Sequence, residues 1–335
     1  MASSEPFDVS AALAAVAEPG ARGGLTTPAE RLRDLPRMSL RDHEKYVSLT
    51  MEFRCNLRCV HCMIEGTMDH LVPTSGETFD RVLEDQRNNG RWEGLVLTGS
   101  EITLRRDLPE LARRARDAGF RHVRIQTHGM HLSRTAYADR LVDAGVDEFF
   151  VSVAGSDAQT HDDITQVSGA WDKMIAGMEH LDRYDHVKLI TNSVVTTRSY
   201  TLLPDMVEAL QHLRQLVQME FWVYFPMAQT DEKGLIARNA DILPFLRRAI
   251  GRARDLGRFV EVKNFPECLL GQQADALVNA QPLLVIDEAF WQEFDRNNFH
   301  KCPHRDVCTS TECLGLSEAY VAKFGDEHDL LTPFR

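Results

Sequence analysis

Short apolar runs alternate with amphipathic stretches from Tyr46 onward, and no other pattern in the chain is as regular. The apolar runs have the length of buried strands, and the longer stretches repeat apolar residues with the period of a helix. The expected strands are residues 46–52, 94–98, 122–127, 148–153, 187–194 and 218–225. The expected helices are residues 78–89, 107–118, 134–144, 170–183, 201–214 and 240–256. This alternation predicts right-handed βαβ units on a parallel sheet, and six units predict an incomplete α/β barrel.

The two ends of the chain differ from this middle part. An alanine-rich stretch at 11–17 and a glycine-containing stretch at 19–24 predict a short helix and a flexible connection. Residues 1–44 are therefore expected to form an N-terminal extension that is partly flexible. The barrel is expected to occupy residues 45–257, and a small cysteine-rich domain residues 258–335.

Composition limits the possible functions. The 335 residues are 43% hydrophobic and 26% charged, which is ordinary for a globular protein. The net charge of −12 argues against nucleic acid or anionic membranes as partners. No apolar run approaches the roughly 20 residues that span a bilayer, and the first residues do not resemble a signal peptide. We therefore expect a cytoplasmic protein, whose seven cysteines bind metal rather than form disulfides.

Three of these cysteines, Cys55, Cys59 and Cys62, stand just after the first expected strand with the spacing C-x3-C-x2-C. Three thiolates on one loop can hold three irons of a four-iron cubane and leave the fourth iron open. A structural zinc ion would need a fourth ligand, and the local candidate, His61, lies directly against Cys62. A disulfide is disfavoured because the number of cysteines is odd. The spacing favours an iron–sulfur cluster, with zinc or inert thiols as the alternatives.

The other four cysteines lie near the C-terminus, at Cys268, Cys302, Cys308 and Cys313. Four thiolates are the number that a second, fully ligated [4Fe-4S] cluster requires. A structural zinc ion is the leading alternative, because four thiolates suit it equally well. The seven cysteines thus divide into three and four, with none left over.

The first cysteine loop resembles that of the radical S-adenosylmethionine (SAM) enzymes, C-x3-C-x-aromatic-C. His61 fills the position where a planar side chain of that family lies near the adenine of SAM. The resemblance implies a partial (β/α)6 TIM-like barrel and a catalytic [4Fe-4S] cluster whose open iron binds the amino and carboxylate groups of SAM. One electron, from a donor such as flavodoxin or ferredoxin, then cleaves SAM to methionine and a 5′-deoxyadenosyl radical. That radical takes a hydrogen atom from the substrate.

A second motif, residues 97–104, resembles the family's T-G-G-E-P-x-L segment. The resemblance implies that Gly99 and Ser100 let the backbone approach the methionine part of SAM, and that Glu101 engages its ammonium group. Ser100 and Ile102 replace the family's second glycine and its proline. The alternative is a strand that ends in an acidic first helical turn, which the helix dipole favours.

Polar residues that end the next strands are candidates for contacts with the nucleoside. Thr127 belongs to a segment that resembles the family's T-N-G, with His128 in place of the asparagine. Ser152 stands at the end of the fourth expected strand, and Asn192 lies in the fifth. Each of these residues is also explained by satisfying the backbone at the edge of a sheet. His161 is expected to be a solvated turn residue with no catalytic role.

The C-terminal cysteine-rich region resembles the SPASM and twitch extensions of the family, which hold auxiliary clusters. The resemblance rests on residues 313–316, Tyr320, Phe324-Gly325 and Pro333. The spacing departs from it, because this chain has C-x5-C-x4-C where relatives often have C-x2-C-x5-C. The resemblance implies an auxiliary [4Fe-4S] cluster that assists substrate binding or electron transfer.

The sequence leaves the substrate open. We expect a small polar natural-product intermediate of the aminosugar or nucleoside type. The first alternative is maturation of a ribosomally made peptide by cross-linking, oxidation or epimerisation. The short N-terminal extension argues against this alternative, because we expect a winged-helix leader-binding domain to need more residues. The second alternative is a non-catalytic zinc-binding protein rich in cysteine.

Overall fold

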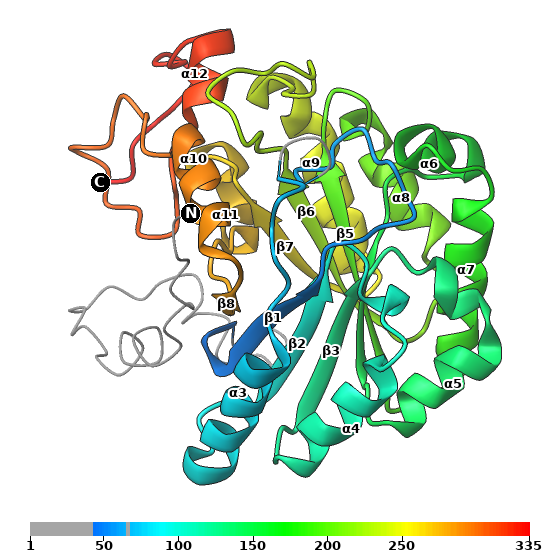
Figure 1. The fold of residues 1–335 in the computed structure, drawn as a ribbon. Coiled ribbons are helices and arrows are strands. Elements are labelled where there is room, and N and C mark those ends of the chain that lie inside the picture. Colours follow the sequence, from blue (N-terminus) through cyan, green and yellow to red (C-terminus); the bar gives the residue numbers. More distant parts are fainter. Residues whose placement is uncertain (1–42, 65–67) are drawn as a thin grey trace.

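The computed structural model describes residues 43–64 and 68–335, and within them a single curved sheet organises the chain (Figure 1). Its eight strands are all parallel, in the order β7-β6-β5-β4-β3-β2-β1-β8. They are β1 (Tyr46–Glu52), β2 (Gly94–Gly99), β3 (His122–Thr127), β4 (Glu148–Ser152), β5 (Lys188–Val195), β6 (Leu216–Val223), β7 (Phe259–Lys263) and β8 (Leu283–Val285). The expected α/β class and partial barrel are confirmed, and two further strands extend the six expected ones.

Helices that alternate with the strands cover the outer face of the sheet (Figure 1). They are α3 (Gly76–Asn89), α4 (Leu108–Asp117), α5 (Thr135–Asp143), α6 (Ala158–Thr165), α7 (Ala170–Leu181), α8 (Leu203–Ala209) and α9 (Asn239–Asp255). Local sequence fixes the ends of α3: the Ser75 side chain accepts from the Thr78 amide, and Gly90 takes the left-handed conformation. The expected helix over 201–214 is shorter than its pattern, because a 3-10 turn precedes α8 at Tyr200–Leu202.

The main core lies between the sheet and these helices. Leu95 and Leu97 of β2 and Phe79 of α3 are fully buried in it. Each such side chain contributes about 1.5–3 kcal/mol by leaving water. No helix of the described residues is long and apolar enough to cross a bilayer.

Polar side chains fill the inner face of the sheet at the amino ends of the strands. The Tyr46 hydroxyl donates to the Glu148 carboxylate at 3.1 Å, and Arg124 pairs with the same carboxylate at 2.9 Å. Gly94 is required beside them, because a Cβ atom there would lie 2.1 Å from the Tyr46 ring. This end of the partial barrel is packed shut, so a site must lie at the carboxyl ends of the strands.

The C-terminal part of the chain both completes the sheet and leaves it. After β7, at one edge, the chain crosses to β8 at the opposite edge, where β8 pairs with β1. These two strands fall within residues 258–335, which the sequence pattern assigned to a separate domain. The remaining helices are α10 (Glu267–Leu270), α11 (Glu288–Phe294) and α12 (Glu318–Phe324), on the side of the sheet away from α5 and α7 (Figure 1). The expected N-terminal extension lies outside the described residues, apart from its last two.

Candidate functional site

The first cysteine loop leaves the carboxyl end of β1, where a barrel of this kind places its site. Cys55 is exposed, and Cys59 and Cys62 are half-buried. The Cys62 amide donates to the Cys59 carbonyl at 2.9 Å, so the last two cysteines share one turn. The Leu57 amide lies 3.4 Å from the Cys55 sulfur. Desolvation of the thiol raises the pKa of Cys55 to about 11, so binding a metal there must release a proton.

Helix α6 supports the middle of this loop. The amides of Arg58 and Val60 donate to the last carbonyls of α6, at Thr165 and Ile164, each at 3.0 Å. These carbonyls have no partner within the helix, so the loop satisfies groups that every helix end leaves open. The contact fixes the backbone between Cys55 and Cys62 before any metal binds.

One neutral histidine lies on the loop and another lies beside it. Burial, with smaller contributions from Lys233 and His161, lowers the pKa of His61 to about 4. The expectation that His161 is a solvated turn residue is wrong: it lies in α6 and is only 1% exposed. Its Nδ1 accepts from the Ala154 amide at 3.2 Å, which places the ring proton on Nε2. Burial lowers its pKa to about 4 as well, so both rings are uncharged near neutral pH.

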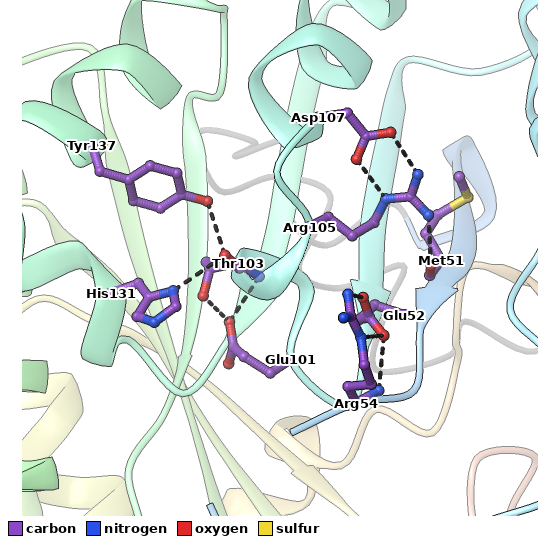
Figure 2. A network of polar contacts seen from close by, with 9 residues as sticks. All are labelled: Met51, Glu52, Arg54, Glu101, Thr103, Arg105, Asp107, His131 and Tyr137. Carbon is purple, nitrogen blue, oxygen red and sulfur yellow. Dashed lines mark hydrogen bonds and ion pairs between the residues drawn. The ribbon is translucent and has the colours of Figure 1, made fainter. Parts of the chain in front are cut away.

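Glu101 is the centre of a buried network at the carboxyl ends of β2 and β3 (Figure 2). One carboxylate oxygen accepts from the Thr103 amide and hydroxyl and from the Thr127 hydroxyl, the last at 2.7 Å. The other accepts from the His128 amide at 2.8 Å. Figure 2 shows His131 directed at Thr103. The Nδ1 atom of His131 lies 3.2 Å from the Thr103 carbonyl oxygen. The structure thus brings Glu101 and Thr127 together, but protein donors already occupy the Glu101 carboxylate, and it is fully buried.

His128 connects this network to the cysteine loop. Its Nδ1 accepts from the Met130 amide at 3.2 Å, so Nε2 carries the proton. Nε2 lies 2.7 Å from the Asn56 side-chain oxygen, next to Cys55. Asn56 was not among the residues predicted from the sequence. The one indication of this contact was His128, which stands where the family has an asparagine.

A second polar group fixes the direction in which the chain leaves β1 (Figure 2). Arg54 binds the Glu52 carboxylate through two nitrogens, at 3.0 and 2.6 Å, and lowers the pKa of Glu52. Arg105 donates to the Met51 carbonyl at 2.9 Å and pairs with Asp107 at 2.6 Å. The residue just before the first cysteine is therefore held to its own strand. No motif in the sequence indicated these contacts.

The close approach at Gly99 is to the protein itself. A Cβ atom on Gly99 would lie 1.9 Å from the Glu52 carbonyl oxygen, which also accepts from the Ser100 amide at 2.7 Å. Gly99 therefore allows the ends of β1 and β2 to join. The Ser100 hydroxyl is buried and has no hydrogen-bond partner among the described residues.

Ser152 and Asn192 are direct neighbours across β4 and β5. They alternate with main-core residues such as Val151 and Val153, so they lie on the inner face of the sheet. Ser152 is exposed, whereas the Asn192 side-chain oxygen is buried without a partner in the described part of the chain. An unpaired buried polar atom costs about 1–3 kcal/mol. Ser100 and Asn192 therefore fit a site in which a polar ligand supplies the missing hydrogen bonds.

The four C-terminal cysteines all line one hollow. Cys268 lies in α10. Cys302, Cys308 and Cys313 lie in the irregular chain before α12. The Ser310 hydroxyl holds the rim together, accepting from the Cys313 amide at 3.1 Å and donating to the Glu267 carboxylate. Desolvation raises the pKa of both Cys268 and Cys313.

Other residues complete the lining of this hollow. They include residues 331–334, Pro266 and Leu316. Across residues 43–64 and 68–335, no three His, Cys, Asp or Glu side chains are placed to hold a single ion. All four cysteines line the same hollow, and four thiols suit either an iron–sulfur cluster or a zinc ion.

Comparison with known proteins finds relatives of the barrel. Residues 51–216 match the Radical SAM superfamily. The AdoMet-dependent heme synthase of Methanosarcina barkeri is 32% identical over 183 residues, which are 53% of this chain and 50% of that protein. The probable GTP 3′,8-cyclase of Metallosphaera sedula is 32% identical over 155 residues, 45% of this chain and 47% of that protein. The chain thus spans about half the length of these relatives.

Solved structures resemble the fold at low sequence identity. One is anSMEcpe with bound AdoMet and the Kp18Cys peptide, with a TM-score of 0.52 and 16% identity over 65% of this chain and 63% of that one. Another is Streptococcus suis SuiB bound to the precursor peptide SuiA, with a TM-score of 0.51 and 15% identity over 67% and 49%. These likenesses concern the fold alone, a curved parallel sheet covered by helices.

Proposed function

We propose that this chain, whose residues 51–216 form a radical SAM domain, is an enzyme that removes a hydrogen atom from a small polar substrate. The observation that carries the proposal is the place of Cys55, Cys59 and Cys62, on one supported loop at the carboxyl end of β1. When bound, a [4Fe-4S] cluster there supplies the electron that cleaves SAM into methionine and the hydrogen-abstracting deoxyadenosyl group. The loop offers three thiols for four irons, which leaves one iron for the cofactor.

Residues around the loop have separate tasks in this proposal. Ser100 and Asn192 hold unpaired buried oxygens, which become satisfied when polar groups of SAM lie against the strand ends. His61 presents an uncharged planar ring for the adenine, and Ser152 is exposed for the ribose. Glu101 acts through Thr127 and His128, whose positions it fixes, and we assign the contact with the SAM ammonium to the backbone at Gly99 and Ser100.

We propose further that the C-terminal cysteines hold an auxiliary [4Fe-4S] cluster and that residues 258–335 act as a SPASM/twitch-like domain. The convergence of all four thiols on one hollow supports this. The cluster would assist substrate binding or electron transfer, while the protein supplies position and electrostatics. Zinc is the alternative occupant, and iron, sulfide and zinc analysis of the purified protein distinguishes the two. Zinc without iron or sulfide would instead support a non-catalytic zinc protein.

A small polar substrate, of the aminosugar or nucleoside type, agrees with the interior of the barrel. Glu220, on the inner face of β6, accepts from the Trp222 indole at 2.7 Å and from Gln218 at 2.8 Å. Lys263 on β7 lies over the Trp222 ring, 5.8 Å from its centre. A polar interior favours a ligand with hydrogen-bonding groups. The names of the two relatives at 32% identity refer to heme and to GTP, which are also small molecules.

Maturation of a ribosomally made peptide is the second candidate. One observation favours it: both solved structures described above contain a bound peptide. Their identities of 15 and 16% limit the inference to fold.

The test is anaerobic reconstitution with iron, sulfide and SAM, followed by incubation with deuterated candidate substrates. Flavodoxin or ferredoxin would serve as the electron donor, in keeping with the cytoplasm as the expected compartment. Deuterium transfer to 5′-deoxyadenosine from a sugar or nucleoside would support the first candidate, and transfer from a peptide the second. Failure of the reconstituted protein to cleave SAM at all would refute both.

A further inference from the structure

A lysine distant in sequence binds the backbone of the cysteine loop. Lys233 Nζ donates to the Cys62 carbonyl at 2.8 Å, across 171 residues of chain. Lys233 belongs to the segment between β6 and α9, which begins at the carboxyl end of β6. No cysteine motif includes it, and its contact is with the last residue of the C-x3-C-x2-C run.

The turn that carries Lys233 is closed by its own hydrogen bonds. The Gly234 amide donates to the Asp231 carbonyl at 3.1 Å, and Gly234 has a φ of +66°. The Asp231 carboxylate accepts from the amides of Leu235 and Ile236, each at 2.9 Å. An aspartate that caps two amides of its own turn gives that turn one conformation. The base of the Lys233 side chain is therefore fixed.

The same turn is held by the barrel on one side and by the C-terminal region on the other. Thr197, after β5, donates its amide to the Leu235 carbonyl at 3.0 Å and its hydroxyl to the Gly234 carbonyl at 2.9 Å. Lys323 of α12 pairs with Asp231 at 2.7 Å. The position of the Lys233 ammonium group thus depends on both parts of the molecule.

The charge of Lys233 lies against the loop, because its ammonium group donates to the backbone carbonyl of a cysteine that would hold the cluster. A positive charge beside a cluster favours an added electron by Coulomb attraction. Net charge and nearby hydrogen bonds are established determinants of iron–sulfur potentials.

We propose that Lys233 is a positioning residue that fixes the Cys62 end of the loop and raises the reduction potential of the cluster bound there. This inference rests on the proposed function, because it requires a cluster on Cys55, Cys59 and Cys62. Its role is to make the cluster easier to reduce when the segment between β6 and α9 is in place. The connection from Lys233 through Asp231 to Lys323 makes that potential sensitive to the C-terminal region.

The test compares Lys233→Met with Lys233→Arg, which keeps the charge, and with Lys173→Met, which removes a charge from the exposed outer side of α7. The reduction potential of the cluster whose EPR signal responds to SAM is measured in each reconstituted protein. Lys233→Met should lower the ratio of reduced to oxidised cluster at a fixed potential three- to tenfold. This corresponds to a reduction potential lower by about 28 to 59 mV for one electron. Lys233→Arg should recover most of the shift, and Lys173→Met should show none.

A second measurement needs no cluster. In the apo-protein, hydrogen exchange of residues 53–64 should become faster in Lys233→Met than in Lys233→Arg, while the thermal melt stays unchanged. An unchanged potential in Lys233→Met, or an equal shift in Lys173→Met, would overturn the inference and leave the proposed function standing. A protein that binds no iron on the first three cysteines would overturn both.

Discussion

The two cysteine sites of this chain are built in opposite ways. The first places three cysteines within eight residues, on a loop that β1, α6 and His128 already hold. The second gathers four cysteines from 46 residues, one in a helix of four residues and three in the irregular chain before α12. The first is a partly exposed loop on a rigid frame, and the second is a hollow lined mostly by irregular chain.

This difference teaches which part of each site depends on the metal. The first loop keeps its shape through backbone hydrogen bonds, so its thiols can leave one iron open without losing their arrangement. The C-terminal region has little regular structure to hold Cys302 and Cys308, so a bound cluster would supply part of its folding free energy. We infer an open, reactive centre on the barrel and a closed, stabilising centre in the C-terminal region.

Removing one thiol from the first loop should have the largest effect. Cys59→Ala leaves two ligands on the loop, and we expect SAM cleavage to fall at least about a thousandfold, because no other group can hold the cofactor to iron. The measurement is 5′-deoxyadenosine by chromatography after anaerobic reduction. Retained cleavage would refute the assignment of the open centre.

The matched change in the other site is Cys308→Ala. Bound iron should fall by half, from about eight to about four atoms, while SAM cleavage uncoupled from substrate persists. Hydrogen exchange over residues 300–335 should become faster, whereas exchange in β1 to β6 should not change. If iron content and exchange both matched the unaltered protein, the closed centre would not exist.

The elements of the barrel were predictable where apolar periodicity was unbroken. β1 and β3 have the predicted bounds, since alternate residues of each meet the core. β7 escaped prediction because Glu261 and Lys263 face inward as a buried ion pair, which breaks the apolar pattern. β8 has only three residues, and such a length carries no periodic signal.

The site was predictable to the extent that it is local in sequence. The three cysteines on one loop are recognisable from their spacing, and Glu101 is recognisable from its position just after its strand. Asn56 and Lys233 acquire their roles through contacts with segments distant in sequence. No pattern along one chain encodes such contacts.

Acid should destabilise the first site through its neutral histidines. His161 has a folded pKa of about 4 and an ordinary value near 6.5, so the unfolded chain binds more protons between these values. The contribution of neutral His161 to the free energy of unfolding is therefore fully present above pH 6.5. It falls by about 3 kcal/mol as the pH drops toward 4. His161→Gln should flatten the dependence of the unfolding free energy on pH in denaturant titrations. A slope equal to that of the unaltered protein would contradict the burial of a neutral ring.

The smallest effect should come from the unpaired oxygens at the strand ends. Asn192→Ala should weaken SAM binding about tenfold, near 1.4 kcal/mol, because one hydrogen bond to the cofactor is lost. The stability of the apo-protein should not fall, since the atom removed has no partner there.

Thr191→Val is the control for this change. It removes another buried unpaired oxygen, but one that points to the helices, so equilibrium SAM binding should stay unchanged. Equal losses in the two variants would show that the effect is one of packing.

The most direct measurement of an open and a closed centre is Mössbauer spectroscopy of protein reconstituted with ⁵⁷Fe, with and without SAM. One open iron among two clusters predicts that about one iron in eight changes its spectrum when SAM binds. A spectrum that does not respond to SAM, or in which two irons of eight respond, would contradict the distinction between the two sites.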